Sequence, residues 1–522
     1  MSKKSFIGGA IILMLAGFVV RILGFVYRIY LSNLIGAEGM GLFQLISPVY
    51  TLVILTLTSG ISIAVSKTVA EELAKNHIVN LRRITSCALM LVIGAGTIVS
   101  VFMFLNVRFI ADVLLRDSRT YYSLLLLIPC IPVIAAAAAI KGYFYGIQDV
   151  TPTAVSQIVE QIVRIGLVMA MASYFLNIGL EFACALATIG MAFGEISNLA
   201  VVYIAYRIKR KKDIQNKGKT GALKKKSIIR SLLNISIPIS LNRFIISIMT
   251  TVEMILIPRR LLTGGLDYQL SMQEYGRLAG MAMPLIFFPS LVTYSLATTL
   301  VPAISEAMSL KNYKSVNYRI SKSIQITFIL GFIFTAVFLA YPDEIGNLIY
   351  KKENIGGMLY LLAFCCIFIY LQQTLLGILN GLGKQGVSLR NFVIGNFIRI
   401  AFVYFIIPIY GIPGYVVGII ISSALVCILN LYSVIKTTGM ALDIRNWLVK
   451  PGLVGIVMLF IARYIYSFCR IFDMGHNWSV VLTIVINVIV AISLMVVVGA
   501  LQKDEILRLF GRVPKKITAK KR

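Results

Sequence analysis

The sequence predicts an all-α polytopic membrane protein with about fourteen transmembrane helices, arranged as two pseudo-symmetric six-helix lobes plus two extra C-terminal helices. Three observations lead to this prediction: the composition, the recurrence of long apolar segments, and a repeat between the two halves. Of the 522 residues, 58% are hydrophobic and 14% are charged, whereas soluble domains hold about 45–50% apolar and about 25% charged residues. This composition excludes a soluble enzyme, a disordered protein and a disulfide-stapled secreted domain.

Fourteen apolar segments are long enough to cross a bilayer, which takes about 20 residues per helix. The first seven are 6–32, 45–66, 84–107, 121–147, 152–177, 182–206 and 232–258. The second seven are 278–305, 323–341, 358–382, 390–409, 412–435, 448–468 and 478–500. Because these runs are continuous rather than alternating, they exclude a transmembrane barrel. The fourth and fifth segments, and the eleventh and twelfth, are joined so tightly that a count of 12 or 13 stays open.

The basic residues indicate how the chain is oriented in the membrane. Lys and Arg number 50 against 21 Asp and Glu, which gives a net charge of +29. Most of them lie in short segments between spans, a pattern typical of membrane orientation rather than of nucleic-acid binding. With the N-terminus inside, the cytoplasmic segments together with the cytoplasmic ends of the adjoining spans contain 35 Lys and Arg, and the outer segments contain 9. We therefore predict a multi-pass protein with both termini cytoplasmic and no nucleic-acid partner.

The two halves of the chain share short motifs in the same order. At an offset of 235 residues, Gly142-x-x-x-Gly146 matches Gly377-x-x-x-Gly381, and Arg164-Ile165 matches Arg399-Ile400. At an offset of 236, Lys75-Asn76 matches Lys311-Asn312. At an offset of 237, Val79-Asn80-x-Arg82 matches Val316-Asn317-x-Arg319. An offset that spans six helices gives both halves the same topology, which is a parallel repeat about an axis along the membrane normal.

The longest polar segment, Arg207 to Arg230, separates the two halves and is rich in Lys and Gly. Its charge fits a role in orientation and solvation, and contact with anionic lipid headgroups is the alternative. The predicted domains are an N-lobe at 1–206, a basic cytoplasmic linker at 207–230, a C-lobe at 231–437, the two extra helices at 438–500 and a basic cytoplasmic tail at 501–522.

The candidate functional residues are the ionisable groups inside the spans. A charge at the bilayer centre costs at least about 2.5–3.5 kcal/mol, so such a group usually faces a polar interior. The acidic ones, expected to be coupling sites or members of structural ion pairs, are Glu160, Glu195 and Glu253. The basic ones are Arg21, Arg28, Arg164, Arg243, Arg399 and Arg463. We expect the first five to line a substrate cavity, and Arg463, on an extra helix, to be structural or lipid-facing.

Two arginines of the first span share one helix face with two glycines. Gly17, Arg21, Gly24 and Arg28 fall at i, i+4, i+7 and i+11, which places them along one stripe of an α-helix. The glycines permit close helix approach, and the arginines beside them are expected to face a cavity. The alternative is that both arginines snorkel or pair structurally.

Arg164 and Arg399 occupy equivalent places in the two halves but differ in their neighbours. Glu160 precedes Arg164 by four residues, so the two can pair on one helix face, and a structural ion pair or a ligand site are both open. At the same distance before Arg399 stands Gly395. Arg399 is therefore expected to be more available to a ligand anion.

The chemistry of these side chains points to an anionic substrate. The guanidinium fork of arginine donates two parallel hydrogen bonds to phosphate, and several arginines in one cavity would fit an organic cation poorly. The two histidines, His77 and His476, are far apart in sequence, so a His-rich metal site is not expected. No nucleophile–base arrangement stands out either. We predict that the protein is not an enzyme, with no catalytic residues, no cofactor and no metal.

Several motifs in the first five spans resemble one bacterial membrane-protein family. They are Arg21-Ile-Leu-Gly-Phe25, Leu34-Ile-Gly-Ala-Glu-Gly-Met-Gly-Leu-Phe43, Ile63-Ala-Val-Ser-Lys-x-Val-Ala-Glu71, Gly142-Tyr-Phe-x-Gly146 and Ser156-Gln-x-x-Glu-Gln-x-x-Arg164. With these motifs, its length and its span count, the chain resembles the stage V sporulation protein B group of the multidrug/oligosaccharidyl-lipid/polysaccharide (MOP) exporter superfamily. That superfamily includes the lipid II flippase and the polysaccharide flippases.

The resemblance implies a flippase with a central cavity between the lobes. A lipid-linked (polyprenyl pyrophosphate) saccharide, such as a peptidoglycan or polysaccharide precursor, would cross the bacterial cytoplasmic membrane by alternating access, with spore cortex synthesis as one setting. The implied partners are this substrate, membrane lipids and cell-wall synthesis enzymes. By analogy with the lipid II flippase, the two extra helices would form a groove for the lipid tail.

The resemblance also ranks the arginines. In the lipid II flippase, arginines on helices 1, 2 and 8 line the cavity. Arg21 matches the first of them, and helix 2 has no arginine here. On helix 8 the matching position is Pro284, and Arg277 lies two turns earlier. The resemblance therefore adds Arg277 to the candidate cavity residues.

Two other functions remain open. The first is a cation-coupled, multidrug-type antiporter of the same superfamily, with Glu160, Glu195 or Glu253 as the coupling site. The second is a membrane glycosyltransferase or polymerase, which would need catalytic carboxylates in a substantial outer loop. The outer loops are short, and their acidic residues show no constellation in the sequence.

Overall fold

The computed structural model describes residues 6–176, 178–215, 223–470 and 476–501. Within these ranges all regular structure is helical, as predicted, and no strand is present. The chain divides into two compact units: unit 1 contains residues 1–281 and 400–414, and unit 2 contains residues 282–399 and 415–522. The centre of the predicted linker and nearly all of the predicted C-terminal tail lie outside the described residues.

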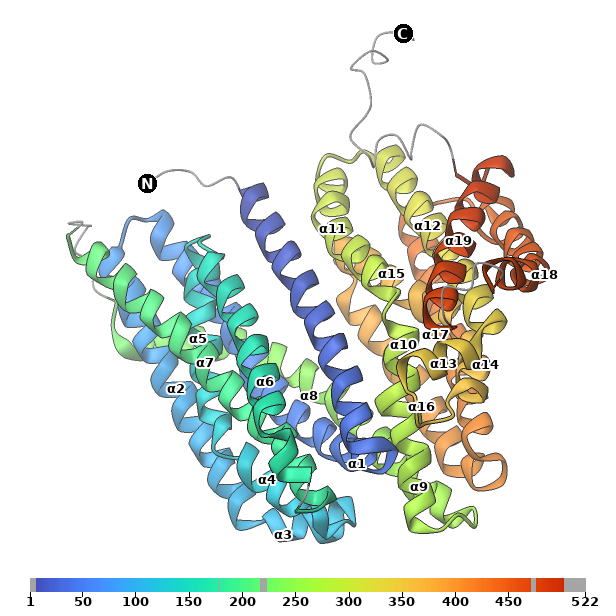
Figure 1. Ribbon diagram of the computed structural model, residues 1–522. Coiled ribbons are helices and arrows are strands. Elements are labelled where there is room, and N and C mark those ends of the chain that lie inside the picture. Colours follow the sequence, from blue (N-terminus) through green and yellow to red (C-terminus); the bar gives the residue numbers. More distant parts are fainter. Residues whose placement is uncertain (1–5, 177, 216–222, 471–475, 502–522) are drawn as a thin grey trace, which may run out of the picture. The chain divides into compact units, whose positions relative to one another are not determined.

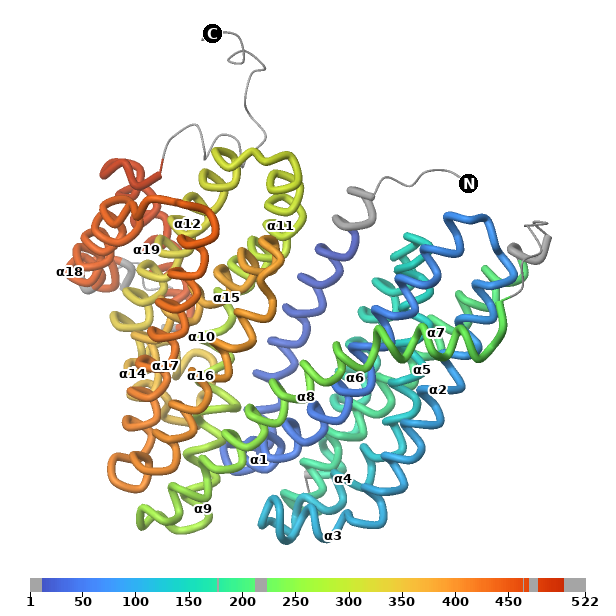
Figure 2. The backbone as a smooth tube through the Cα atoms, turned by 180° about the vertical axis from the view of Figure 1, so that it is seen from behind, coloured from blue at the N-terminus to red at the C-terminus, as the bar shows by residue number. Residues whose placement is uncertain are grey.

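Unit 1 is a bundle in which α2, α5, α6, α7 and the second arm of α1 lie side by side (Figures 1 and 2). Its helices are α1 (Phe6–Ala74), α2 (Ile78–Leu105), α3 (Val107–Phe109), η1 (Ile110–Leu115), η2 (Ser118–Thr120), α4 (Tyr121–Leu127), α5 (Cys130–Gly146), α6 (Thr151–Leu176), α7 (Leu180–Gln215), α8 (Lys225–Thr263), α9 (Tyr268–Tyr275) and η3 (Gly276–Ala282). Its apolar core includes the fully buried Tyr143 and Phe144 of α5.

Helix α1 consists of two arms that meet at Gly36. The φ of Gly36 is 67°, in the left-handed region that glycine adopts without the steric cost of a side chain. The arms carry the spans predicted at 6–32 and 45–66, and the second arm continues to Ala74. One glycine therefore turns a single unbroken helix into two crossing segments.

Unit 2 is built around α11, α12 and α15, with α18 and α19 packed together and α18 also against α12. Its helices are α10 (Met283–Phe287), α11 (Ser290–Ser309), α12 (Tyr313–Ala340), α13 (Pro342–Ile349), α14 (Gly356–Ala363), α15 (Cys366–Gly381), α16 (Gln385–Phe405), α17 (Ile407–Thr438), η4 (Arg445–Val449), α18 (Lys450–Arg470) and α19 (His476–Val497). The end of α16 and the start of α17 belong to unit 1.

The repeated glycine motif makes the same kind of contact in both units. A Cβ added at Gly142 would lie 2.7 Å from the carbonyl oxygen of Ser62, so α5 contacts α1 backbone to backbone. A Cβ added at Gly377 would lie 2.7 Å from Cα of Ala297, which brings α15 equally close to α11. Small residues four apart allow such approach within membranes.

The backbone repeats as well. Asn76 and Lys311 have positive φ values of 62° and 53°, and Gln148 and Gly383 have 58° and 71°. Both pairs are 235 positions apart and end equivalent helices. The break between α4 and α5, a bend of 41°, has its equivalent in the 53° bend between α14 and α15. These matches support the pseudo-symmetric halves predicted from the motifs.

The number of spans agrees with the prediction within its range. Ten described helices are long and apolar enough to cross a membrane, and the number rises to 13 if each bent pair is one span. Helix α1 counts once among them, and treating its two arms as separate spans gives the predicted fourteen, which stays a prediction. The lobe boundaries also stay a prediction; in the structure α8, predicted to begin the C-lobe, belongs to unit 1.

Candidate functional site

Unit 1 contains a polar cluster inside its predicted spans, which we call the intramembrane cluster. It contains two of the predicted acidic residues and one predicted arginine, together with three residues that were not predicted. Its members are Tyr50 (α1), Lys141 (α5), Glu160 and Arg164 (α6), and Glu195 and Asn198 (α7).

The carboxylate of Glu160 is the centre of this cluster. Arg164 Nη2 donates to Glu160 Oε1 at 2.6 Å, and Asn198 Nδ2 donates to Glu160 Oε2 at 2.8 Å. Asn198 Nδ2 also lies 3.4 Å from Glu195 Oε2. The side chains of Arg164 and Glu160 are 15% and 13% exposed. The helical spacing of four residues thus gives the predicted ion pair, and Asn198 ties it to α7.

Glycines bring the two helices of the cluster together. A Cβ added at Gly194 of α7 would lie 3.1 Å from the carbonyl oxygen of Glu160, and one at Gly190 would lie 3.2 Å from that of Arg164. Larger residues there would hold α7 away from α6. Glu195 and Asn198, which follow these glycines on α7, therefore reach the ion pair on α6.

Lys141 balances the charge of the cluster and was not predicted. It lies near the end of the span 121–147 that is predicted to be cytoplasmic, and it is close enough to Glu195 and Glu160 for electrostatic interaction. Among the described residues it forms no ion pair within 4 Å. The cluster therefore combines two basic and two acidic side chains. The sequence signal for Lys141 is its position on the helix that carries the repeated glycine motif.

Three polar atoms of the cluster are buried without a hydrogen-bond partner among the described residues. They are the hydroxyl of Tyr50, Nε of Arg164 and Oδ1 of Asn198. Buried polar atoms almost always have partners in folded proteins, and ordered water is the usual one when the protein supplies none. These three atoms can therefore take water or another small polar group as their partner.

The predicted arginines of the first span lie on the first arm of α1. Arg21 and Arg28 are half-buried, and the buried Tyr27 hydroxyl is within electrostatic range of Arg28 and Arg164. The expected close helix approach at Gly17 and Gly24 is not found within unit 1, because a Cβ at either position meets nothing within 4 Å.

Arg399 is held by hydroxyl groups in unit 2. Its Nε donates to Ser422 Oγ at 3.1 Å, and its Nη2 lies 3.4 Å from Ser423 Oγ. Both serines belong to α17 and are buried. The equivalent residues Arg164 and Arg399 thus differ in environment. Arg164 binds the carboxylate of Glu160 on its own helix, whereas Arg399 binds the hydroxyl groups of two serines on the next helix.

The remaining predicted residues are scattered. Arg243 is exposed and Glu253 is 2% exposed on the same helix, α8, so they are not neighbours in one site. Arg277 forms an ion pair with Glu274 at 3.0 Å, three residues earlier. The side chain of Arg463 lies outside the described part of the chain.

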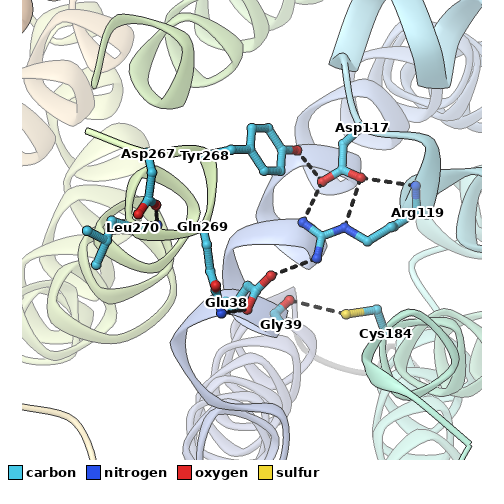
Figure 3. Close-up of polar contacts among 9 residues, drawn as sticks. All are labelled: Glu38, Gly39, Asp117, Arg119, Cys184, Asp267, Tyr268, Gln269 and Leu270. Atoms are coloured by element: carbon cyan, nitrogen blue, oxygen red, sulfur yellow. Dashed lines mark hydrogen bonds and ion pairs between the residues drawn. The ribbon is translucent and has the colours of Figure 1, made fainter. Parts of the chain in front are cut away.

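A second polar group lies in unit 1 outside the predicted spans, and we call it the outer network (Figure 3). The segments between spans 1 and 2, 3 and 4, and 7 and 8, all predicted to lie on the outer side, meet there. Its members are Glu38, Asp117, Arg119, Tyr268 and Gln269. The outer acidic residues, among which the sequence shows no constellation, therefore do gather in the structure.

Arg119 is the centre of the outer network. Its Nη1 donates to Glu38 Oε1 at 2.6 Å, and its Nε and Nη2 donate to the two oxygens of Asp117 at 3.1 and 3.0 Å. The Tyr268 hydroxyl donates to Asp117, and Gln269 Nε2 donates to Glu38 Oε2 at 3.1 Å. Both carboxylates thus bind one arginine.

Electrostatics keep this network charged. Burial raises the pKa of the Tyr268 hydroxyl, and the hydrogen bond to Asp117 raises it further. Burial acts to lower the pKa of Arg119, but its hydrogen bonds with Asp117 and Glu38 outweigh burial and raise that pKa. Tyr268 therefore stays a hydrogen-bond donor and Arg119 stays a cation. No signal in the sequence joins these residues, because they come from three distant segments.

The described residues offer no site for a metal. No group of three or more His, Cys, Asp or Glu is arranged among them to hold an ion. The six cysteines described are all buried and unpaired.

Comparison with known proteins identifies relatives along the whole chain. A family model described as "Polysaccharide biosynthesis protein" matches residues 6–308, and a second, MatE, matches residues 278–405. Stage V sporulation protein B of Bacillus subtilis (strain 168) is 29% identical over 511 residues, which cover 98% of each chain. Lipid II flippase MurJ of the same organism is 27% identical over 429 residues, which cover 77% of each. A solved structure of lipid II flippase MurJ in an inward closed conformation has a TM-score of 0.66 at 16% identity, over 96% of this chain and all of that one.

Proposed function

This chain belongs to the polysaccharide biosynthesis protein family of the MOP exporter superfamily, and from that membership we propose that it flips a lipid-linked saccharide across the cytoplasmic membrane. The substrate class is a polyprenyl pyrophosphate carrying a peptidoglycan or polysaccharide unit, moved by alternating access, and spore cortex synthesis is one setting for it. The protein is a multi-pass membrane transporter related to flippases.

The observation that supports this substrate best is the state of the intramembrane arginines. Arg21 and Arg28 are half-buried within the first span, and Arg399 is held by the hydroxyls of Ser422 and Ser423. Such arginines fit a pyrophosphate, whose oxygens accept paired hydrogen bonds.

The experiment is a flipping assay in proteoliposomes with defined polyprenyl pyrophosphate saccharides. Arg21→Lys keeps the charge but offers a point donor instead of a fork, so we expect it to lose most of the flipping rate and Arg21→Ala to lose more. Lys352→Gln removes an exposed charge in unit 2 and serves as the control. Normal flipping by a well-expressed Arg21→Ala, Arg399→Ala double variant contradicts the proposal that these arginines bind the pyrophosphate.

A second candidate function is cation-coupled antiport of a small molecule. The intramembrane cluster supports it, because Glu195 and Glu160 lie beside Lys141 with unpartnered buried atoms between α1, α6 and α7, and the MatE model matches part of the second half. Glu195→Gln separates the two functions: it abolishes gradient-driven transport in the antiporter and leaves flipping intact if the cluster is structural.

A further inference from the structure

We propose that the outer network is a latch that holds α9 against α1, and that it releases when the transporter opens toward the outer side. The proposal rests on the proposed transport function and deepens it by naming the element that moves.

The eighth predicted span belongs partly to each unit. Helix α9, which directly precedes this span, and most of η3 lie in unit 1, whereas from Ala282 onward the chain continues in unit 2 as α10 and α11. The span is also bent by 59° before Ser290. Because the two parts are covalently joined, a rearrangement between the units must bend this span further or detach α9 from α1.

The contact between α9 and α1 is close and uses the backbone. A Cβ added at Gly276 would clash with the carbonyl oxygen of Ala37, and one at Gly41 would clash with that of Met272. The Tyr275 hydroxyl donates to the carbonyl oxygen of Gln44 at 3.0 Å. This surface fits only when α9 is fully docked, so the docked state is a discrete one.

The outer network closes over this contact with charged side chains that remain partly accessible to water. Glu38 is 19% exposed and Arg119 is 29% exposed, whereas Asp117 is 3% exposed. Partly accessible charges regain some water when they separate, so the pair of Glu38 and Arg119 costs less to open than a fully buried ion pair would. An apolar contact of the same size would not release into water as readily.

The hinge for such a movement adjoins the latch. Gly36, with its φ of 67°, joins the arms of α1 two residues before Glu38. Hinges are short segments near element ends that absorb large backbone changes. Releasing Glu38 from Arg119 and Gln269 therefore frees the part of α1 at which the first arm can swing.

The test uses a reporter cysteine on the buried side of α9. Ser271 of α9 is 1% exposed and its hydroxyl has no partner among the described residues, so Ser271→Cys changes little. In lipid nanodiscs, where both faces are accessible, we measure its rate of reaction with a water-soluble maleimide. Arg119→Gln removes three charge-assisted hydrogen bonds and is expected to raise this rate at least about tenfold.

Two further variants make the test decisive. Tyr268→Phe removes one hydrogen bond and keeps the ring near Arg119, so we expect a rise of about threefold; it decides the test if Arg119→Gln does not fold. Arg116→Gln is the matched control, because it removes the same charge from the same segment at an exposed side chain, and its rate should stay within about twofold. Unchanged rates in folded Arg119→Gln or Tyr268→Phe overturn the proposal.

A cross-link relates the latch to transport. Glu38→Cys with Gln269→Cys is bridged by a short bis-thiosulfonate reagent, and we expect flipping to stop and to return on reduction, while each single variant treated alike is unaffected. Normal flipping by the cross-linked protein overturns the latch. If the labelling rates respond as expected but neither form flips any polyprenyl-linked saccharide, the latch stands and the proposed function fails.

Discussion

At the scale of single residues, sequence spacing predicts contacts between side chains on the same helix but not contacts between side chains on different helices. Glu160 and Arg164 are four residues apart, and the structure joins them at 2.6 Å. Lys141 and Asn198 come from α5 and α7, and only the packing of those helices brings them to the pair. A charged residue in a span thus signals a polar interior without revealing its partners.

Replacing Glu160 tests whether the ion pair is structural. Glu160→Gln leaves Arg164 without its carboxylate, and breaking a buried pair typically costs about 3–5 kcal/mol. We expect a clear loss of unfolding free energy but retained flipping, because Glu160 then only orients Arg164. Denaturant unfolding of the purified protein measures the first effect and the proteoliposome assay the second.

A control variant and a double variant complete the test of the ion pair. Glu306→Gln neutralises an exposed carboxylate on α11 and should change neither quantity. The double variant Glu160→Gln, Arg164→Gln should lose less stability than the two single losses added together, because contacting residues are coupled. Fully additive losses would show that the pair contributes nothing as a pair.

The outer network illustrates why some site residues are out of reach of the sequence. Glu38, Asp117 and Tyr268 lie in three segments separated by whole spans, and no periodicity relates them. The motif around Glu38 contributes to the family resemblance, but the role of Glu38 as partner of Arg119 depends on the fold. Side chains that meet only through long-range packing can be identified as one site only from the structure.

At the scale of helices, the glycine motif carries most of the predictable information. It marked the repeat in the sequence, and in the structure it sets the distance between α5 and α1 and between α15 and α11. The bends in three spans were not predicted. Pro129 and Pro289 stand at the start of α5 and α11, and proline ends the preceding helix, yet the break before α15 has no proline and follows only from the repeat.

A pair of alanine substitutions tests the packing role of these glycines. Gly142→Ala places a methyl group 2.7 Å from the carbonyl oxygen of Ser62 and 3.0 Å from Val65 Cβ. Overpacking of this kind typically costs about 1–3 kcal/mol, so we expect a lower thermal midpoint in detergent. Gly166→Ala on α6 meets nothing within 4 Å and should not lower it. Equal midpoints for both variants would remove the packing argument.

At the scale of the whole molecule, the charge distribution predicts the orientation, which the fold alone leaves open. The bias of 35 to 9 in Lys and Arg places the segment of Lys314 inside and that of Lys352 outside. Both side chains are exposed. An impermeant maleimide added to intact cells should label Lys352→Cys and miss Lys314→Cys until the membrane is permeabilised. The reverse pattern would invert the topology and the span count with it.

The driving force is the last property of the whole transporter that can be predicted. Moving one elementary charge through 100 mV is worth about 2.3 kcal/mol, and an anionic headgroup that leaves a negative interior moves downhill. If the arginines carry a pyrophosphate without a compensating ion, a potassium diffusion potential, negative on the cytoplasmic side, should accelerate outward flipping in proteoliposomes without any sodium or proton gradient. A potential of opposite sign should slow it. A different result would assign the intramembrane cluster to ion coupling: the flipping rate would not depend on the potential, would require an ion gradient, and would be lost in Glu195→Gln.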